Sequence, residues 1–480
     1  MLLNPVGGVG AGKGRTIMTR RTILKDAYLL TMDERLGQRT GDILIEDGVI
    51  ADVADSIRIA DAELVNLAGA IVMPGMIDTH IHLWQSAIRG LASETWGREY
   101  FGLVHPLSGR YRPADMYAST LGGAIELLHS GTTTVFDFCH ATNSPQHAEA
   151  SLRALDDSGI RGIFGFCFRH RPEAGITGFT TFDERHQVLE KLVAEWSEHE
   201  RVSLGVALNN IDHVSPEVHT REVESARRLG LRQSIHSNLP GQVSLSAGAG
   251  LLGEDISWVH AGPIDDDEID LLVESGGSIA FTPEIEAAMM GIAPRVGAAR
   301  RRGVPVSIGT DVPSALNGSL LTQLRIARAV IHAVDGQTER AQNRSGTRTA
   351  RHPSFDTMDL LRLATIDGAR VLGMADTIGS ISVGKAADLL VIDTAPFGLA
   401  AGSAADFVVY QSTARNLAAV YVGGEAVVSE GRHTRADLPR VRQQLDETRD
   451  WVLGRSADSE WPEIDEETRA RYEAGQGKAS

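Results

Sequence analysis

The sequence is poor in cysteine, which excludes a fold held together by disulfide bonds. Cys139 and Cys167 are the only two cysteines among 480 residues. Secreted domains that depend on disulfides carry several pairs of cysteines in a short chain. Two isolated thiols are typical of a reducing compartment, so we expect a cytoplasmic protein.

The sequence also lacks long hydrophobic runs. A helix that crosses a bilayer needs about 20 consecutive apolar residues, and no stretch of this chain provides them. The first residues, MLLNPVGGVGAGKG, do not join a basic segment to an apolar one, so we expect no secretory signal. The sequence therefore predicts no association with a membrane.

Positive charge is scarce as well. The chain carries 46 Lys and Arg residues against 63 Asp and Glu residues, which gives a net charge of −17. Binding of nucleic acid requires a basic surface, so nucleic acid is not an expected partner. A small molecule remains the expected partner, because a small substrate experiences mainly the local charge of its pocket.

What the chain does contain is a long alternation of short β-rich runs and amphipathic helical stretches. Its length suits one large α/β barrel with a smaller domain. Eight largely apolar runs, each followed by a helical stretch, predict a closed parallel (β/α)8 barrel, the TIM-like class of α/β fold. The predicted strands are 76–83, 132–138, 161–168, 202–210, 231–238, 256–262, 277–283 and 305–311.

Further β-rich segments with turn sequences lie on both sides of this region, which predicts a small composite β-sandwich domain formed by both terminal regions. A polar stretch at 336–353 is expected to form a long loop, either a lid or simply a solvated loop. The predicted domains are a flexible N-terminal tail (1–20), the composite β-sandwich (21–73 plus 376–435), the metal-binding barrel (74–375) and a C-terminal helical extension (436–480).

Side chains that can bind a metal gather at the ends of the predicted strands. His80 and His82 are two residues apart on one strand and therefore point to the same face. The fifth, sixth and eighth strands end in His236, His260 and Asp311. The carboxyl ends of barrel strands meet at one face, where active sites lie. This convergence favours a metal site over the alternative, a set of unrelated buried histidines with structural hydrogen bonds.

The chemistry of these side chains suits a single divalent ion. Imidazole and carboxylate ligands fit zinc, and also iron(II) or manganese. Three nitrogens and one carboxylate would leave a position for a water molecule, whose pKa the ion lowers toward ~7. We expect zinc in preference to iron(II) or manganese. We expect Asp311 to act also as a proton acceptor, and His260 to polarise the substrate or bond the attacking hydroxide.

Several of these segments together resemble the amidohydrolase superfamily over about residues 22–430. They are PGMIDTHIH at 74–82, the later His236 and His260, GTD at 309–311 and GSISVGKAADLLVID at 379–393. The chain looks most like the branch that contains triazine hydrolases and the cytosine, guanine and S-adenosylhomocysteine deaminases. That resemblance implies a distorted TIM barrel with a small β-sandwich, and a homo-oligomer, either a dimer or a tetramer.

The resemblance also implies roles for individual residues. By resemblance, His260 contacts the water or the substrate, and Gln85 lies on the substrate side. Members with two metal ions bridge them with a carbamylated lysine on a middle strand. None of the five lysines of this chain lies at a predicted strand end, so one ion is expected; they are Lys13, Lys25, Lys191, Lys385 and Lys478. The implied metal ligands are His80, His82, His236 and Asp311.

One position departs from the family pattern. Deaminase-like members place a glutamate three residues after the histidine of strand five, where this chain has Leu239. The nearest carboxylates at a strand end are Glu284 and Glu286. Because Pro283 fixes the turn before it, Glu284 is the expected general acid or substrate anchor, and Glu286 is a candidate for binding substrate. The alternative is that both are ordinary loop residues.

Apolar side chains near the same strand ends predict a pocket for a flat, apolar substrate, with packing as the alternative role. Trp84 is the substrate-binding candidate among them. A basic cluster after strand three either holds a substrate carboxylate or, as we favour, is a solvated loop. The apolar residues are Trp84, Trp96, Tyr100, Phe101, Met289 and Met290, and the basic ones are Arg169, His170 and Arg171.

Together these features predict a metal-dependent hydrolase. Metal-bound hydroxide is expected to attack an electrophilic carbon of a small nitrogen-containing, heterocyclic compound and to cleave a non-peptide C–N bond. The leucine at position 239 keeps a second interpretation open, namely dechlorination, ring opening of a cyclic amide, or decarboxylation at the same mononuclear site. A third interpretation, an inactive binding protein, conflicts with the complete set of ligands.

Overall fold

Eight parallel strands form the centre of the molecule. The computed structural model describes residues 20–168, 181–342, 355–395, 398 and 402–454. The strands pair in sequence order, and nearly every residue on them is buried, as expected when helices cover the outside of a barrel. They are β6 (Met76–Ile81), β7 (Thr132–Cys139), β8 (Arg161–Cys167), β9 (Val202–Ala207), β10 (Gln233–Ser237), β11 (Ile256–His260), β12 (Ser278–Phe281) and β13 (Val306–Ile308).

The ring closes between its first and last strands. A parallel bridge pairs Ile81 of β6 with Asp311, three residues after the end of β13. All eight predicted strands coincide with observed ones, and the predicted fold class, a TIM-like barrel with a separate sheet built from the terminal regions, is confirmed.

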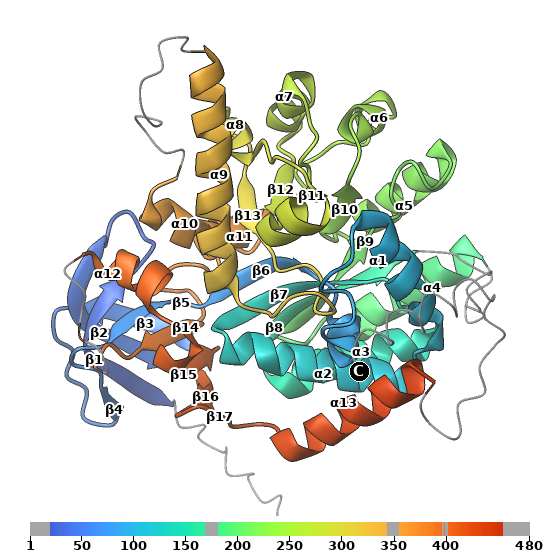
Figure 1. Ribbon diagram of the computed structural model, residues 1–480. Coiled ribbons are helices and arrows are strands. Elements are labelled where there is room, and N and C mark those ends of the chain that lie inside the picture. The colour runs from blue at the N-terminus through green and yellow to red at the C-terminus, as the bar shows by residue number, and fades with distance from the viewer. Residues whose placement is uncertain (1–19, 169–180, 343–354, 396–397, 399–401, 455–480) are drawn as a thin grey trace, which may run out of the picture.

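Helices follow the strands and cover the barrel (Figure 1). Their starts carry the expected capping groups: Ser215 and Asp265 accept hydrogen bonds from the backbone N–H groups of Val218 and Glu268. The helices are α1 (Gly97–Val104), α2 (Pro113–His129), α3 (Pro145–Ser158), α4 (Phe182–Trp196), α5 (Pro216–Arg228), α6 (Gln242–Gly248), α7 (Asp266–Ser275), α8 (Val296–Arg301), α9 (Leu320–Gln342), α10 (Thr357–Leu363) and α11 (Ile366–Val371).

Both terminal regions contribute to a second, mixed sheet beside the barrel (Figure 1). Its two halves meet where β5 pairs antiparallel with β14. The residue bounds of the separate domains stay a prediction. The strands are β1 (Arg21–Leu30), β2 (Gln38–Glu46), β3 (Val49–Ala54), β4 (Glu63–Asn66), β5 (Ile71–Pro74), β14 (Leu389–Ile392), β15 (Leu417–Val422), β16 (Glu425–Ser429) and β17 (Arg432–His433).

A tight turn between β2 and β3 requires glycine. Asp47 and Gly48 both have positive φ, 45° and 87°, as in a two-residue hairpin whose twist matches its strands. A Cβ on Gly48 would lie 2.6 Å from the carbonyl oxygen of Gly423, which belongs to the turn between β15 and β16. The two hairpins therefore touch, and only glycine fits the contact.

The polar stretch near residue 340 differs from expectation. The predicted loop at 336–353 is wrong for residues 336–342, which continue α9 away from the body of the molecule (Figure 1). Glutamine, glutamate, arginine and alanine form helices well even without an apolar face. Residues 343–354 lie outside the described residues, as do 1–19 and 455–480. Near the C-terminus, α13 (Leu438–Val452) packs on α2, where the Thr448 hydroxyl bonds Asp115.

No helix in the described parts of the chain is both long enough and apolar enough to cross a membrane.

A buried ion pair joins the barrel to the mixed sheet. Arg161 at the start of β8 donates from Nε and Nη2 to the two carboxylate oxygens of Asp388, at 2.7 and 3.1 Å. Both side chains are buried, and the same carboxylate accepts the backbone N–H of Gly423 at 2.7 Å. Removing one member of such a pair leaves a buried charge without compensation.

We therefore expect Asp388→Asn to lower the free energy of unfolding by about 3–5 kcal/mol, measured by urea denaturation. Asp270→Asn is the matched control, because the Arg302–Asp270 pair is largely exposed; its loss should stay below about 1 kcal/mol. Equal losses in the two variants would contradict this account of the interface.

Candidate metal centre

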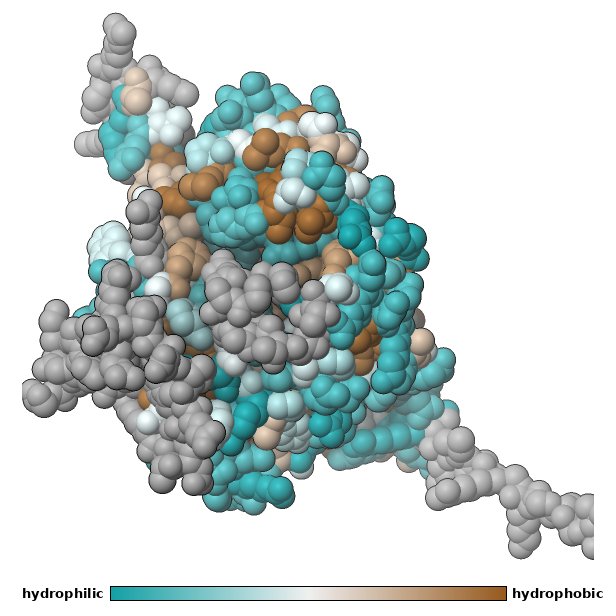
Figure 2. Space-filling model, turned by 90° about the vertical axis from the view of Figure 1, so that its right-hand side faces the viewer, coloured by the Kyte–Doolittle hydropathy of each residue, from teal (hydrophilic) through white to brown (hydrophobic). Residues whose placement is uncertain are grey.

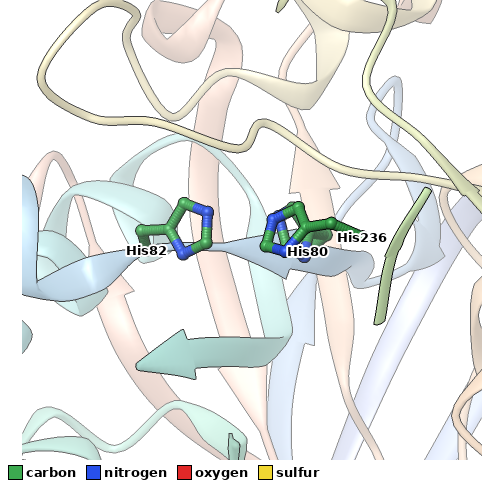
Figure 3. Close-up of side chains that lie close together, drawn as sticks. All are labelled: His80, His82 and His236. Atoms are coloured by element: carbon green, nitrogen blue, oxygen red, sulfur yellow. The ribbon is translucent and has the colours of Figure 1, made fainter. Parts of the chain in front are cut away.

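Three histidines meet at the carboxyl ends of β6 and β10. One ring nitrogen from each of His80, His82 and His236 lies within 4.8 Å of the others. Figure 3 shows the three rings close together, with His80 on β6 and His82 directly after the end of that strand. Asp311 adds a carboxylate oxygen, Oδ1, at 3.4 Å from Nε2 of His80 and 3.2 Å from Nε2 of His82.

The closure of the barrel places Asp311 against the histidines of β6. The backbone N–H of Asp311 donates to the carbonyl of His80 at 2.9 Å, and that of His82 donates to the carbonyl of Asp311 at 2.8 Å. Buried Asp78 reinforces the junction, because its carboxylate accepts from the His80 N–H and from the N–H and hydroxyl of Thr310. The first strand of the barrel and the segment that follows its last strand are thus held together at the metal site.

The surroundings of these side chains fit a bound cation. Both ring nitrogens of His80 are buried, and neither has a hydrogen-bond partner in the described residues. His82 contacts the carbonyl of Phe138 through Nδ1 at 2.6 Å, which leaves Nε2 directed at Asp311. Histidine ligands in metal sites are commonly oriented by such a contact through their second nitrogen. The residues present therefore suit a divalent ion.

Burial keeps His80 and His236 neutral, the form that binds metals. It lowers the pKa of His80 to about 3 and that of His236 well below its usual range. Burial raises the pKa of Asp311, but the nearby imidazoles of His80 and His82 outweigh that effect and hold the pKa well below its usual range. The site therefore combines neutral imidazoles with an ionised carboxylate.

The backbone is strained at two of the strand ends that form the site. His260 and Asp311 both have φ of 69°, and Ala261 has φ of 47°. Non-glycine residues rarely adopt this left-handed region, and they cluster at functional sites where the surrounding structure enforces it. Here the turn aims both side chains across the mouth of the barrel.

His260 lies beside Asp311, with Nε2 at 3.8 Å from Oδ2 of that carboxylate. Its Nδ1 contacts the hydroxyl of Thr282 at 2.7 Å and lies 3.7 Å from Oε1 of Glu286. Burial lowers the pKa of His260, but Glu286 and Asp311 outweigh it and raise that pKa overall. His260 is thus fixed from behind and faces the metal cluster.

A cavity of about 1290 Å³ opens above this cluster and includes His82, His236, His260 and Asp311 in its wall. Ordinary ligand pockets measure ~300–1,000 Å³, so this one holds more than a single ring. Leu239 also lines it and is 53% exposed. Figure 2, which views the side where α4 and α5 lie in Figure 1, shows hydrophobic surface gathered there. Apolar lining residues include Trp96, Tyr100, Phe101, Met289 and Met290.

Residues 71–427 match the model of the amidohydrolase family. The chain belongs to the amidohydrolase family. This confirms the predicted family and the predicted class of activity, a metal-dependent hydrolase of non-peptide C–N bonds.

Two curated relatives of this amidohydrolase illustrate the similarity. A 5-methylthioadenosine/S-adenosylhomocysteine deaminase of Nitratidesulfovibrio vulgaris is 28% identical over 459 residues, which cover 90% of this chain and 97% of the relative. A 5'-deoxyadenosine deaminase of Methanosarcina acetivorans is 26% identical over 396 residues, or 77% of this chain and 84% of the relative.

Two solved structures share the fold. An adenosine deaminase from Xanthomonas campestris with bound zinc aligns with a TM-score of 0.79 at 22% identity, covering 90% of this chain and 98% of the other. The atrazine chlorohydrolase TrzN from Arthrobacter aurescens, complexed with zinc, aligns with a TM-score of 0.75 at 22% identity, covering 89% and 100%.

Four residues that were predicted to act as an acid or to bind substrate in this amidohydrolase lie outside the cavity wall. Trp84 is fully buried and its ring packs edge-on against that of Tyr111. Gln85 is also fully buried, where it donates to the Tyr100 hydroxyl at 2.7 Å and accepts from the Ser314 hydroxyl at 2.5 Å. A short helical turn, η1 (Leu83–Ile88), follows His82 directly and turns these side chains into the core. Contact with substrate is therefore not supported for either.

The two carboxylates after β12 are likewise engaged elsewhere. Glu284 accepts a hydrogen bond from Nε2 of Gln323 at 2.8 Å. Glu286 is fully buried behind His260 and accepts the backbone N–H of Thr282 at 3.0 Å. The expected roles, an acid for Glu284 and substrate binding for Glu286, are not supported by these positions. Glu286 instead lies where it can orient His260.

Sequence analysis missed several polar residues of the cavity wall, among them His105, His140, Arg185, Asn209 and Glu222. The His140 ring centre lies 4.5 Å from that of His82. His140 follows the end of β7 by one residue, so its place at a strand end could have revealed it. Glu222 lies inside α5, where no sequence pattern marks it. The basic cluster of Arg169, His170 and Arg171 lies outside the described residues.

Removal of one ligand should remove the metal. We expect His80→Ala to lower zinc affinity by more than about 100-fold, because the variant loses one of three clustered imidazole ligands. The ring nitrogens of His80 have no other partner among the described residues. Zinc per chain, measured by elemental analysis after dialysis, reports the loss. His199→Ala, which removes a partly exposed imidazole, is the control. Unchanged zinc in His80→Ala would contradict the assignment.

Glu286 should act through His260. We expect Glu286→Gln to leave bound metal near the wild-type amount and to lower kcat about 10- to 100-fold, because the orientation of His260 is lost. Steady-state kinetics and elemental analysis measure both quantities. Glu284→Gln makes the same change in the same loop and should leave kcat within about twofold. A larger effect at Glu284 than at Glu286 would reverse the two roles.

Proposed function

We propose that this amidohydrolase uses one divalent ion, zinc in preference to iron(II) or manganese, to hydrolyse a C–N bond of a small nitrogen heterocycle. The observation that carries this proposal is the convergence of histidine nitrogens and a carboxylate at the floor of a large cavity. The proposed ligands are His80, His82, His236 and Asp311.

When bound, the ion would lower the pKa of a water molecule toward ~7 and so supply a nucleophile at neutral pH. The protein would supply the proton transfers. Asp311 accepts the proton of the attacking water, because its ionised carboxylate lies at the ligand cluster. His260, held by Thr282 and Glu286, donates a hydrogen bond from Nε2 to the oxygen that develops negative charge.

The substrate class rests on the cavity and on the relatives. Aromatic and methionine side chains in the wall suit a flat ring, and the volume leaves room for an attached group. The two relatives described above are named as deaminases of 5-methylthioadenosine, S-adenosylhomocysteine and 5'-deoxyadenosine. We therefore propose an aminated purine or related heterocycle. A cytoplasmic location and a dimer or tetramer remain part of the proposal, and light scattering tests the latter.

Leu239 favours a second candidate reaction at the same metal site. A leucine side chain cannot protonate a leaving group, and Leu239 lines the cavity. A reaction whose leaving group departs without a proton, such as displacement of chloride from a chlorinated ring, needs no acid at this position. Ring opening of a cyclic amide and decarboxylation would release neither ammonia nor chloride.

The two candidate reactions differ in the leaving group that they release. The zinc-loaded protein is assayed with adenosine derivatives and with matched aminated and chlorinated triazines, reading ammonia, chloride and product mass. We expect ammonia release from at least one aminated ring, abolished by His80→Ala. Chloride release alone would favour the second candidate, and no turnover of any compound would overturn a hydrolytic function.

A glutamate introduced at position 239 makes this test more sensitive. We expect Leu239→Glu to raise ammonia release relative to chloride release by at least about tenfold, since a positioned general acid contributes ~10²–10⁴-fold to rate. Leu245→Glu is the control, because Leu245 is also exposed, at 57%, and lies outside the cavity wall among the described residues. An equal gain in both variants would show a general charge effect.

A further inference from the structure

A buried carboxylate that the proposed reaction does not use lies in the cavity wall. Glu222 is on α5, is 0% exposed, and lines the same cavity as the metal cluster. Burial raises the pKa of Glu222 to about 7, although hydrogen bonds from Asn209 act to lower it. Burying a carboxylate costs free energy unless it forms hydrogen bonds. The hydrogen bonds of Glu222 therefore identify the group that it positions.

Those bonds converge on one neighbour. Oε2 of Glu222 accepts the backbone N–H of Asn209 at 3.1 Å, and Oε1 accepts the side-chain amide nitrogen of the same residue. The amide of Asn209 turns its NH2 group toward Glu222, whose carboxylate oxygen accepts from it. The amide oxygen of Asn209 then points the other way, and no described residue donates to it.

Asn209 lies beside the metal cluster. Ser234 of β10 pairs with Ala207 of β9, and the N–H of Leu208 donates to the carbonyl of Ser234 at 2.9 Å, so pairing continues past the end of β9. Asn209 follows Ala207 by two residues and His236 follows Ser234 by two, so both lie at the carboxyl ends of neighbouring strands. Adjacent strands are ~4.8 Å apart, and both residues line the cavity.

We propose that Asn209 is a substrate-recognition residue and that Glu222 is its positioning residue. Glu222 holds the amide so that its oxygen accepts a hydrogen bond from an N–H or O–H of the substrate next to the metal cluster. This inference rests on the proposed function and narrows its substrate class. The substrate carries an amino, ring N–H or hydroxyl donor that reaches Asn209 in the wall of the cavity.

The experiment compares ligands that differ by such a donor. Adenine is compared with purine, and 5′-deoxyadenosine with 2′,3′,5′-trideoxyadenosine, by calorimetry on the zinc-loaded protein. We expect the wild type to bind the donor-bearing member of at least one pair more tightly. Asn209→Leu should abolish that preference, and Glu222→Gln should reduce it by about tenfold, the value of one oriented hydrogen bond.

The double variant separates positioning from a merely structural role. If Glu222 acts through Asn209, then Asn209→Leu/Glu222→Gln should match Asn209→Leu within about twofold. Effects that multiply in the double variant would overturn the proposal, as would an unchanged preference in Asn209→Leu or no binding of either pair. Glu224→Gln, on the exposed side of the same helix, is the control and should leave the preference unchanged.

Binding and turnover report on different claims. The calorimetric preference requires no chemistry, so it can stand even if no compound is hydrolysed, in which case the proposed function fails and the recognition role holds. Conversely, hydrolysis with a preference that ignores both substitutions would keep the function and overturn the recognition role. Zinc content equal to that of the wild type verifies that each variant retains its metal cluster.

Discussion

The site depends on one pair of backbone hydrogen bonds, between the first strand of the barrel and the segment after the last. They join His80 and His82 to Asp311 and thereby bring residues 230 positions apart into one cluster. Asp78 reinforces the junction from below through Thr310. Because closure fixes these strand ends, the side chains meet without a flexible loop having to order itself around them.

Around this junction, buried groups hold the side chains that face the cavity. The Phe138 carbonyl orients His82, Thr282 and Glu286 hold His260, and Glu222 holds Asn209. In each case a buried acceptor or hydroxyl selects which atom of its neighbour turns toward the cavity. Such support fixes side-chain direction, which matters for chemistry as much as residue identity.

The strand ends and the ligand cluster could be predicted from sequence, because period-two patterning and the one-sided geometry of a barrel leave few choices for residues such as His80 or Asp311. The wall of the cavity could not. Trp84 and Gln85 follow a strand end as closely as any ligand does, yet a helical turn carries them into the core. Glu222 faces the cavity from within a helix, between exposed Arg221 and buried Val223, where no motif sets it apart. The direction that a side chain takes after the end of a strand is set by tertiary contacts, which the local sequence does not encode.

The mixed sheet has a consequence for biogenesis. Its halves join through β5 and β14, whose paired residues are more than 300 positions apart, and buried Arg161 finds its carboxylate only at Asp388. During translation β1 to β5 and then the barrel strands emerge before β14, with that guanidinium uncompensated and the edge of β5 open. Domains tend to fold as they are synthesised, but this one cannot finish until its last strands leave the ribosome. The nascent chain therefore exposes an unpaired strand edge for most of its synthesis, and such edges tend to pair with strands of other chains.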